Sequence, residues 1–373
     1  MTPKVSWEQA LAWRMRRHYL DPIGDRPVVE VVRRLCGVQA QVASSAELAV
    51  RLRRKRSNSG EIALALRDGR LIKTWAMRGT LHLLTPEDAG AFLSLLAAGR
   101  SWELPSWERW FGISPAKHQA MRAVVREALD HKTLTREQLV AAITRHRGFG
   151  HLAEALRSGW GSLLKPLAWQ GDLCFGPSQG ARVTFMRPDQ ASARWRGVPE
   201  PDDAAPIAIA SYVGCYGPAT VEGFRNFVTR GRISARRVRE WFDDVRPKLA
   251  EVDVGGEPAF IMPEHLDELV SIKPSRAVRL VAGFDQFVMG PGTDDGHVVP
   301  TKRRRTISKQ AGWIAPVVLV GGVARATWEI DGNYLVVGWF KEAGAVPAPA
   351  LRAEAARLAA ILDRDLILRV RRV

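Results

Sequence analysis

The strongest constraint on the fold is a pattern that recurs three times along the chain. In each case helical segments precede a strand, a turn and a second strand, which ends at proline and an acidic residue. The strand pairs are expected at residues 71–77 and 80–84, at 172–175 and 183–186, and at 249–254 and 259–262. Glycine-containing turns between short β-branched runs are typical of hairpins. Helices followed by a hairpin are the order of a winged helix, so the sequence predicts three tandem winged-helix units.

Polar residues mark where several helices of these units should begin. A serine or threonine followed three residues later by glutamate or glutamine is a capping box. The chain has three that matter here: Ser6 with Gln9, Ser44 with Glu47, and Thr135 with Gln138. In the third unit, Ser234 is expected to cap a helix over residues 235–242.

The composition changes twice along the chain and divides it into domains. Residues 191–205 are rich in proline, aspartate and alanine and are expected to form a linker. Beyond about residue 273, strands are expected at 278–289, 315–320, 323–329 and 333–340, then a helix at 346–363 and a strand at 366–370. We therefore expect an α+β chain with winged helix 1 at 1–100, winged helix 2 at 101–190, the linker, winged helix 3 at 206–272 and a C-terminal β-rich domain at 273–373.

The charge of the chain favours a polyanionic partner. Its 55 Lys and Arg exceed its 39 Asp and Glu, which gives a formal net charge of +16. Arginine clusters lie at 51–56, 225–239 and 302–305, and arginine binds phosphate in a bidentate manner. A solvated surface would account for any one cluster, but three together favour nucleic acid.

Other classes of protein are disfavoured by what the sequence lacks. No apolar run is long enough for a membrane span, and the N-terminus has no apolar signal core. Cys36, Cys174 and Cys215 are too far apart for a metal-ligand motif, so we expect reduced, buried thiols and no metal or cofactor. No nucleophile elbow, P-loop, zinc-protease helix or calcium loop is present.

Two glutamines provide the clearest candidate for chemistry. Gln39 and Gln41 lie between a predicted helix that ends before Gly37 and the helix that Ser44 should open. In a turn or a short extended piece, both amides can face one point, where they could orient water or read a base edge. Exposed turn glutamines without a function are the alternative.

Aromatic and histidine residues are less informative. His82 is expected on a strand as an exposed or hydrogen-bonded residue rather than a catalytic one. Trp102, Trp107 and Trp110 could stack on DNA bases, but helix packing is the simpler interpretation.

Three segments of the sequence resemble the AlkZ-type winged-helix DNA glycosylases: residues 33–49, which contain Gln39-Ala40-Gln41, residues 74–83, and residues 312–328. The resemblance spans nearly the whole chain. It implies three tandem winged helices in a concave arrangement, followed by a C-terminal β domain. It also implies excision of N7-alkylated purines from DNA, including interstrand crosslinks made by azinomycin-class natural products, in repair or in self-resistance to a genotoxin. The family's catalytic signature, glutamine–apolar–glutamine, matches Gln39, Ala40 and Gln41 without departure.

The resemblance leads to a hypothesis of monofunctional, hydrolytic base excision in which Gln39 and Gln41 position water. A Schiff-base route through Lys55 or Lys73 stays open. The expected partner is double-stranded DNA that contains alkylated or crosslinked purines, bound by a monomer in the bacterial cytoplasm and nucleoid. The expected phosphate-binding residues are Arg51, Arg53, Arg54, Lys55 and Arg56 beside the site, and Lys302, Arg303, Arg304 and Arg305 on a loop that we expect to be mobile.

Two other functions compete with this hypothesis. A winged-helix transcription regulator would use residues 234–242 as its recognition helix and would release no base. A nonspecific DNA-protecting protein would share the positive charge but would give the glutamines no role.

Overall fold

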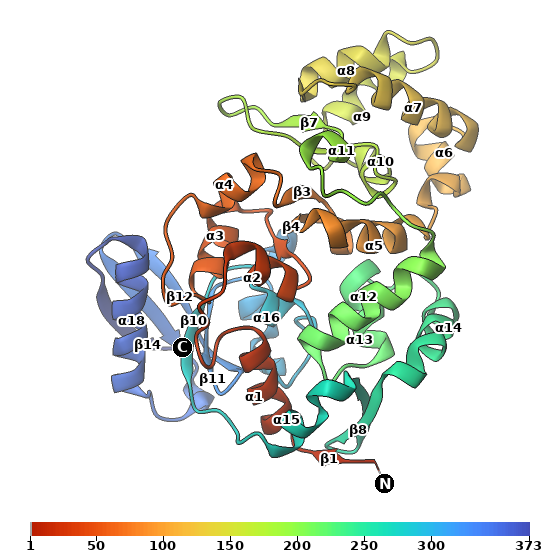
Figure 1. The fold of residues 1–373 in the computed structure, drawn as a ribbon. Coiled ribbons are helices and arrows are strands. Elements are labelled where there is room, and N and C mark those ends of the chain that lie inside the picture. The colour runs from red at the N-terminus through yellow and green to blue at the C-terminus, as the bar shows by residue number, and fades with distance from the viewer. Residues whose placement is uncertain (1) are drawn as a thin grey trace. The chain divides into compact units, whose positions relative to one another are not determined.

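Hydrogen-bonded strands flanked by helices organise the chain in the computed structural model, which describes residues 2–373 (Figure 1). Contacts within the chain divide it into two units. Unit 1 combines Met1–Glu61, Ile209–Phe227 and Phe242–Val373, and unit 2 combines Ile62–Ala208 and Val228–Trp241. The expected mixture of helices and sheets, the α+β class, is confirmed.

Unit 2 contains five strands that lie in the order β4, β3, β6, β7, β5. The strands are β3 (Ile72–Trp75), β4 (Leu81–Leu84), β5 (Leu134–Thr135), β6 (Cys174–Phe175) and β7 (Thr184–Met186). The helices are α4 (Glu61–Arg67), α5 (Pro86–Ala97), α6 (Pro105–Phe111), α7 (Pro115–Ala128), α8 (Arg136–Thr144), α9 (Ala153–Arg157), α10 (Leu164–Trp169) and α11 (Pro188–Ala191), with 3₁₀ turns at Met77–Gly79, Ser101–Glu103 and Gly150–Leu152. The first two predicted hairpins are confirmed as β3–β4 and β6–β7.

The core of unit 2 is built around Trp75, which is 3% exposed. Its ring meets Phe175 edge-on, with ring centroids 4.7 Å apart. Gly161 has φ of 64°, and a Cβ there would lie 2.4 Å from the Trp75 ring. A larger residue at position 161 would therefore displace the tryptophan or strain the backbone.

The first part of unit 1 contains β1 (Lys4–Val5), α1 (Trp7–Arg17), α2 (Val28–Arg34), β2 (Val38–Gln39) and α3 (Ala43–Arg51). Three further helices have residues in both units: α12 (Pro201–Tyr216), α13 (Val221–Thr229) and α14 (Ala235–Val245). The third predicted hairpin is confirmed as β8 (Ala250–Val254) and β9 (Glu257–Ile261), followed by α15 (Leu266–Ser271), with 3₁₀ turns at Arg246–Lys248 and Pro263–His265. β1 pairs in parallel with β8, with Lys4 opposite Asp253, so the N-terminus joins the third hairpin.

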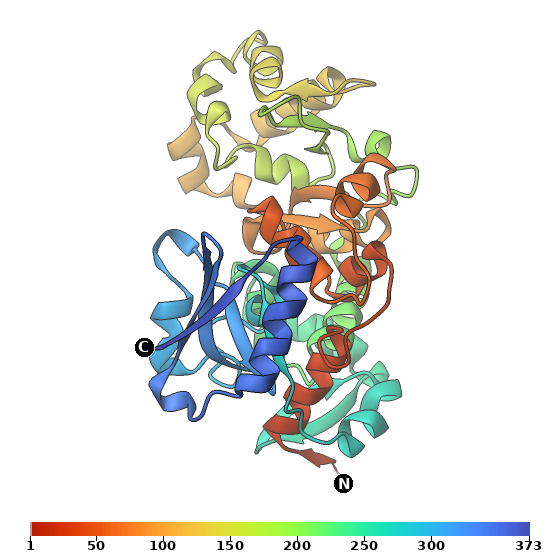
Figure 2. The ribbon, with the colours of Figure 1, turned by 90° about the vertical axis from the view of Figure 1, so that its left-hand side faces the viewer.

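The C-terminal part of unit 1 is a five-stranded sheet in the order β10-β11-β12-β13-β14. The strands are β10 (Val278–Val281), β11 (Val317–Val320), β12 (Val323–Asp331), β13 (Tyr334–Trp339) and β14 (Ile367–Arg372). β14 runs parallel to β13, and the other neighbours are antiparallel. Helix α18 (Ala348–Leu362) packs against β10 and lies beside the sheet in both views (Figures 1 and 2). Short helices lie at α16 (Gln286–Met289) and α17 (Arg304–Ile307), with 3₁₀ turns at Thr301–Arg303, Gln310–Gly312 and Lys341–Ala343.

Several predicted details are confirmed. The capping boxes of Ser6 and Thr135 form, and Ser234 accepts a hydrogen bond from the Arg237 amide at 3.2 Å. All three cysteines are buried, free thiols. Gly321 and Gly322 form the turn between β11 and β12, whereas Gly332 and Asn333 form the turn between β12 and β13, because Asp331 still pairs with Tyr334.

Three predicted elements are wrong in part. The Ser44–Glu47 capping box does not form, because α3 begins at Ala43 with Val42 as N-cap, and Glu47 accepts the Gly60 amide at 2.8 Å instead. The strand predicted over 278–289 ends at Val281, because the left-handed φ of 60° at Phe284 breaks it. Residues 201–205 of the predicted linker form the first turn of α12.

The division into three winged helices, with its sequential boundaries, stays a prediction. Within residues 2–373, no helix combines the length and the apolar character that a membrane span requires.

Candidate active site

The Gln39-Ala40-Gln41 turn joins β2 to α3, so the glutamines lie between two helices as predicted. α2 ends at Arg34, and the chain then reverses through Cys36 and Gly37, which have φ of 55° and 97°. The Gly37 amide donates to the Val32 carbonyl at 2.9 Å, so Gly37 ends the helix as expected. Gln39 is 4% exposed, whereas Gln41 is exposed to solvent.

Two buried side chains hold the backbone that leads into this turn. The Gln286 amide nitrogen donates to the Gly37 carbonyl at 2.7 Å, and the Tyr216 hydroxyl donates to the Leu35 carbonyl at 2.9 Å. Gln286 and Tyr216 are each 1% exposed. Buried carbonyls that accept such bonds fix the local backbone, because breaking the bond leaves a desolvated acceptor. The glutamine turn is therefore anchored by residues far away in the sequence, which no local pattern could identify.

Arg53 is not available to phosphate, so its predicted role as a DNA-binding residue is wrong. Its side chain is 0% exposed and makes two bonds of 2.7 Å to the Asp285 carboxylate. It also donates to the Ala49 carbonyl at 2.8 Å. Burial by itself would lower the pKa of Arg53, but the Asp285 carboxylate more than offsets this and raises it. Asp285 also caps α16 by accepting the Phe287 amide at 2.8 Å, so the pair ties the end of α3 to the segment that carries Gln286.

The other members of the first basic cluster differ in exposure. Arg51 donates to the Ile361 carbonyl, and Arg54 pairs with Glu61 and donates to the Arg26 carbonyl at 2.8 Å. Both are partly buried. Lys55 is exposed, and Arg56 is 86% exposed with an ion pair of 2.9 Å to Asp25. The solvent-facing charge of this cluster therefore resides mainly on Lys55 and Arg56.

The second basic cluster is helical rather than the expected loop. Lys302 and Arg303 lie in a 3₁₀ turn, and Arg304 and Arg305 begin α17. Arg303 makes two 2.7 Å bonds to Glu342 and lies 4.7 Å from the Phe340 ring centroid, so it has a structural role. Lys302, Arg304 and Arg305 are exposed.

In unit 2, His82 and Lys73 lie on the β3–β4 hairpin. His82 is 0% exposed and its Nδ1 is 3.0 Å from the Thr80 carbonyl, which confirms a hydrogen-bonded strand residue. Burial and the nearby Arg78 charge lower the pKa of His82 to about 3. Burial also lowers the pKa of Lys73, whose ammonium lies 5.6 Å from the Phe175 ring centroid.

The three clustered tryptophans have different environments. Trp102 is 8% exposed and stacks on His118 at 5.2 Å, and Trp107 packs against Phe111 at 4.6 Å. Helix packing is therefore confirmed for both of them. Trp110 is 82% exposed.

The chemistry of the turn is that of neutral amides. A glutamine carbonyl oxygen accepts a hydrogen bond from water but is not a strong base. No group of three or more His, Cys, Asp or Glu that could hold a metal ion occurs within residues 2–373.

Comparisons with known proteins agree with the resemblance found in the sequence. The family described as "DNA glycosylase AlkZ-like" matches residues 32–361. A Streptomyces sahachiroi protein named interstrand DNA cross-link repair glycosylase is 46% identical over 357 residues, which cover 95% of this chain and 96% of that protein. The solved structure of Streptomyces sahachiroi DNA glycosylase AlkZ is similar with a TM-score of 0.95 and 45% identity, covering 99% of this chain and 100% of that one.

Proposed function

This chain belongs to the AlkZ-like DNA glycosylase family, and on that premise we propose that it hydrolyses the N-glycosidic bond of N7-alkylated purines in DNA. The substrates include bulky and crosslinked guanine adducts. The observation that carries the proposal is the glutamine turn, whose backbone is held by buried bonds from Gln286 and Tyr216 while Gln41 faces solvent. A transcription regulator, the main alternative, would give the two glutamines of this anchored turn no role.

The proposed mechanism relies on position rather than on strong acid or base. An N7-alkylguanine already carries positive charge, so it leaves as a neutral base without protonation by the enzyme. Water must then be held at C1′ of the sugar as the cation forms. A carbonyl oxygen of Gln39 or Gln41 accepts a hydrogen bond from that water, and the other amide holds the geometry. Ala40 between them adds little bulk.

The electrostatics of unit 1 support DNA as the partner. The exposed cations of its two basic clusters are Lys55, Arg56, Lys302, Arg304 and Arg305. We propose that these five residues bind phosphates, whereas Arg53 and Arg303 stabilise the fold. Replacing any one of the five with alanine should reduce the slope of log affinity against log salt by about 0.9, because one phosphate fewer is neutralised.

A single-turnover assay on duplex DNA that contains N7-methylguanine tests the catalytic proposal. Gln39→Ala and Gln41→Ala should each lower the rate of base release, and Gln119→Ala, a change of an exposed glutamine on α7, should leave it unchanged. Unchanged rates in both turn variants would refute the role of the pair. Borohydride should trap no protein–DNA adduct, because a hydrolytic route forms no Schiff base.

The preference for crosslinks is a finer proposal, supported by the name of the Streptomyces relative. We propose that a monomer in the bacterial cytoplasm removes both monoadducts and crosslinked guanines. Rates on one duplex with a monoadduct and a matched duplex with an interstrand crosslink would measure this. Release from the monoadduct alone would restrict the substrate class, and release from neither would refute the proposed substrates.

A further inference from the structure

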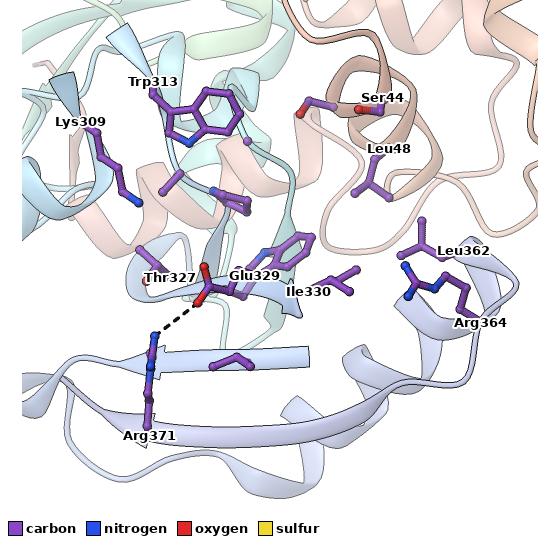
Figure 3. Close-up of a pocket in the computed structure, with 17 residues that line it drawn as sticks. Ser44, Leu48, Lys309, Trp313, Thr327, Glu329, Ile330, Leu362, Arg364 and Arg371 are labelled. Carbon is purple, nitrogen blue, oxygen red and sulfur yellow. Dashed lines mark hydrogen bonds and ion pairs between the residues drawn. The ribbon is translucent and has the colours of Figure 1, made fainter. Parts of the chain in front are cut away.

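Unit 1 contains a pocket of about 640 Å³ that begins three residues after Gln41 (Figure 3). One wall is the first part of α3, with Ser44 and Leu48. The opposite side is formed by the segment before β11 and by strands β12 and β13, and the end of α18 closes one edge. A volume of this size is within the range of about 300–1,000 Å³ that is typical of small-ligand sites.

An accessible tryptophan lines this pocket. Trp313 is 45% exposed and lies across the cavity from the apolar side chains of Leu48 and Ile330 (Figure 3). Phe284 supports its ring edge-on, with centroids 5.1 Å apart and an interplanar angle of 79°. Trp328, also in the lining, is fixed by a 3.0 Å bond from its indole nitrogen to the Val281 carbonyl. The pocket therefore presents a braced, open aromatic face, which suits a flat aromatic ligand.

The charged residues of the lining favour an anionic ligand. Lys309, Arg364 and Arg371 are cationic, and Glu329 is the one acidic residue of the lining. Arg371 pairs with Glu329 at 3.3 Å, and Arg364 donates to the Gly332 carbonyl at 2.8 Å. Within residues 2–373, the Lys309 ammonium makes no ion pair, and its backbone amide donates to the Trp313 carbonyl at 2.8 Å. This backbone bond holds Lys309 and Trp313 in one turn, and both residues line the pocket.

We propose that this pocket binds one unpaired nucleotide of a DNA strand, with the base stacked on Trp313 and its phosphate at Lys309. A nucleotide combines the two properties that the lining selects, a flat aromatic face and a negative charge. The inference rests on the proposed function only in taking DNA as the ligand. It adds a nucleotide-binding site to the glutamine turn and assigns residues that lie outside the Gln-Ala-Gln motif.

Binding to undamaged single strands tests this site without any catalysis. Anisotropy would compare a labelled oligonucleotide with a chain of abasic sites that has the same number of phosphates. Wild type should prefer the base-containing strand by about five- to 150-fold, the ratio that stacking of one base provides. Trp313→Ala should abolish this preference, and Trp110→Ala, which removes an 82% exposed tryptophan from α6, should retain it. Lys309→Ala should weaken both complexes and lower the salt slope by about 0.7.

Photo-crosslinking of wild type to an oligonucleotide that contains 5-iodouracil provides a second measurement, independent of the folding of any variant. The mapped adduct should be on Trp313. Adducts confined to other residues, or a base preference that survives Trp313→Ala, would overturn the proposal. Gln119→Ala should bind both strands as wild type does. The strands carry no lesion and no base is released, so failure of the catalytic proposal and failure of this one give different results.

Discussion

Replacing Arg53 with methionine separates a structural role for this residue from contact with DNA. The structure predicts that Arg53→Met leaves the Asp285 carboxylate buried without its partner, since both side chains are at most 1% exposed. Breaking a buried pair by removing one member costs about 3–5 kcal/mol. Whole domains are stable by about 5–15 kcal/mol, so the effect should be large. Urea denaturation of the full chain, followed by circular dichroism, would measure it.

Two controls make this prediction specific. Arg56→Met removes an 86% exposed arginine from the same cluster and should change the free energy of unfolding by less than about 1 kcal/mol. The double variant Arg53→Met with Asp285→Leu should recover most of the stability, because replacing both members of a buried pair by apolar residues is often neutral. A deficit of about 1 kcal/mol should remain, since Asp285 also caps α16 through the Phe287 amide.

One result would refute the reasoning. If Arg53→Met unfolds like wild type while the salt slope of DNA binding falls by about 0.9, then Arg53 contacts a phosphate. Arg53 would then be a DNA-binding residue, as its place in the basic cluster suggests, and the buried pair with Asp285 would be wrong. An unchanged slope together with a large drop in stability is the outcome that the structure predicts.

Three further variants test other parts of the structure. Tyr216→Phe removes the donor to the buried Leu35 carbonyl, so the free energy of unfolding measured in urea should fall by about 1–3 kcal/mol. The same variant should slow single-turnover base release. A fully active variant would show that the glutamine turn does not need this bond. Folding keeps His82 neutral, because its pKa is about 3 in the folded protein and about 6.5 in the unfolded chain. The contribution of neutral His82 to the free energy of unfolding is therefore complete above pH 6.5 and is lost as the pH falls toward 3. Between pH 7.5 and 5 this loss should be about 2 kcal/mol, and His82→Phe should remove that part of the pH dependence; equal losses in both proteins would contradict it. Burial lowers the pKa of Lys73, which favours the neutral amine that Schiff-base chemistry needs, yet Lys73→Met should release base at the wild-type rate. A borohydride-trapped adduct that this variant lacks would establish lyase chemistry instead.

Local signals in the sequence predicted the elements of the fold well. The Ser6 and Thr135 capping boxes and all three hairpins appear where their residues indicated, because such signals act over only a few residues. The Ser44–Glu47 box had the same pattern and failed, because Glu47 found a partner in the Gly60 amide. A more distant hydrogen bond, which the spacing of the motif could not reveal, thus replaced the local one.

The sequence by itself determined the two glutamines, the excess of positive charge and the membership of the family, because a short motif and a composition can be read without coordinates. Only the tertiary structure decided which basic residues remain available to DNA. Arg53 and Asp285 are 232 positions apart, and Gln286 and Gly37 are 249 apart, so their pairing depends on how distant segments pack. Burial and pairing are properties of three-dimensional neighbours, and for that reason Arg53 stabilises the fold while Arg56, three positions later, faces solvent.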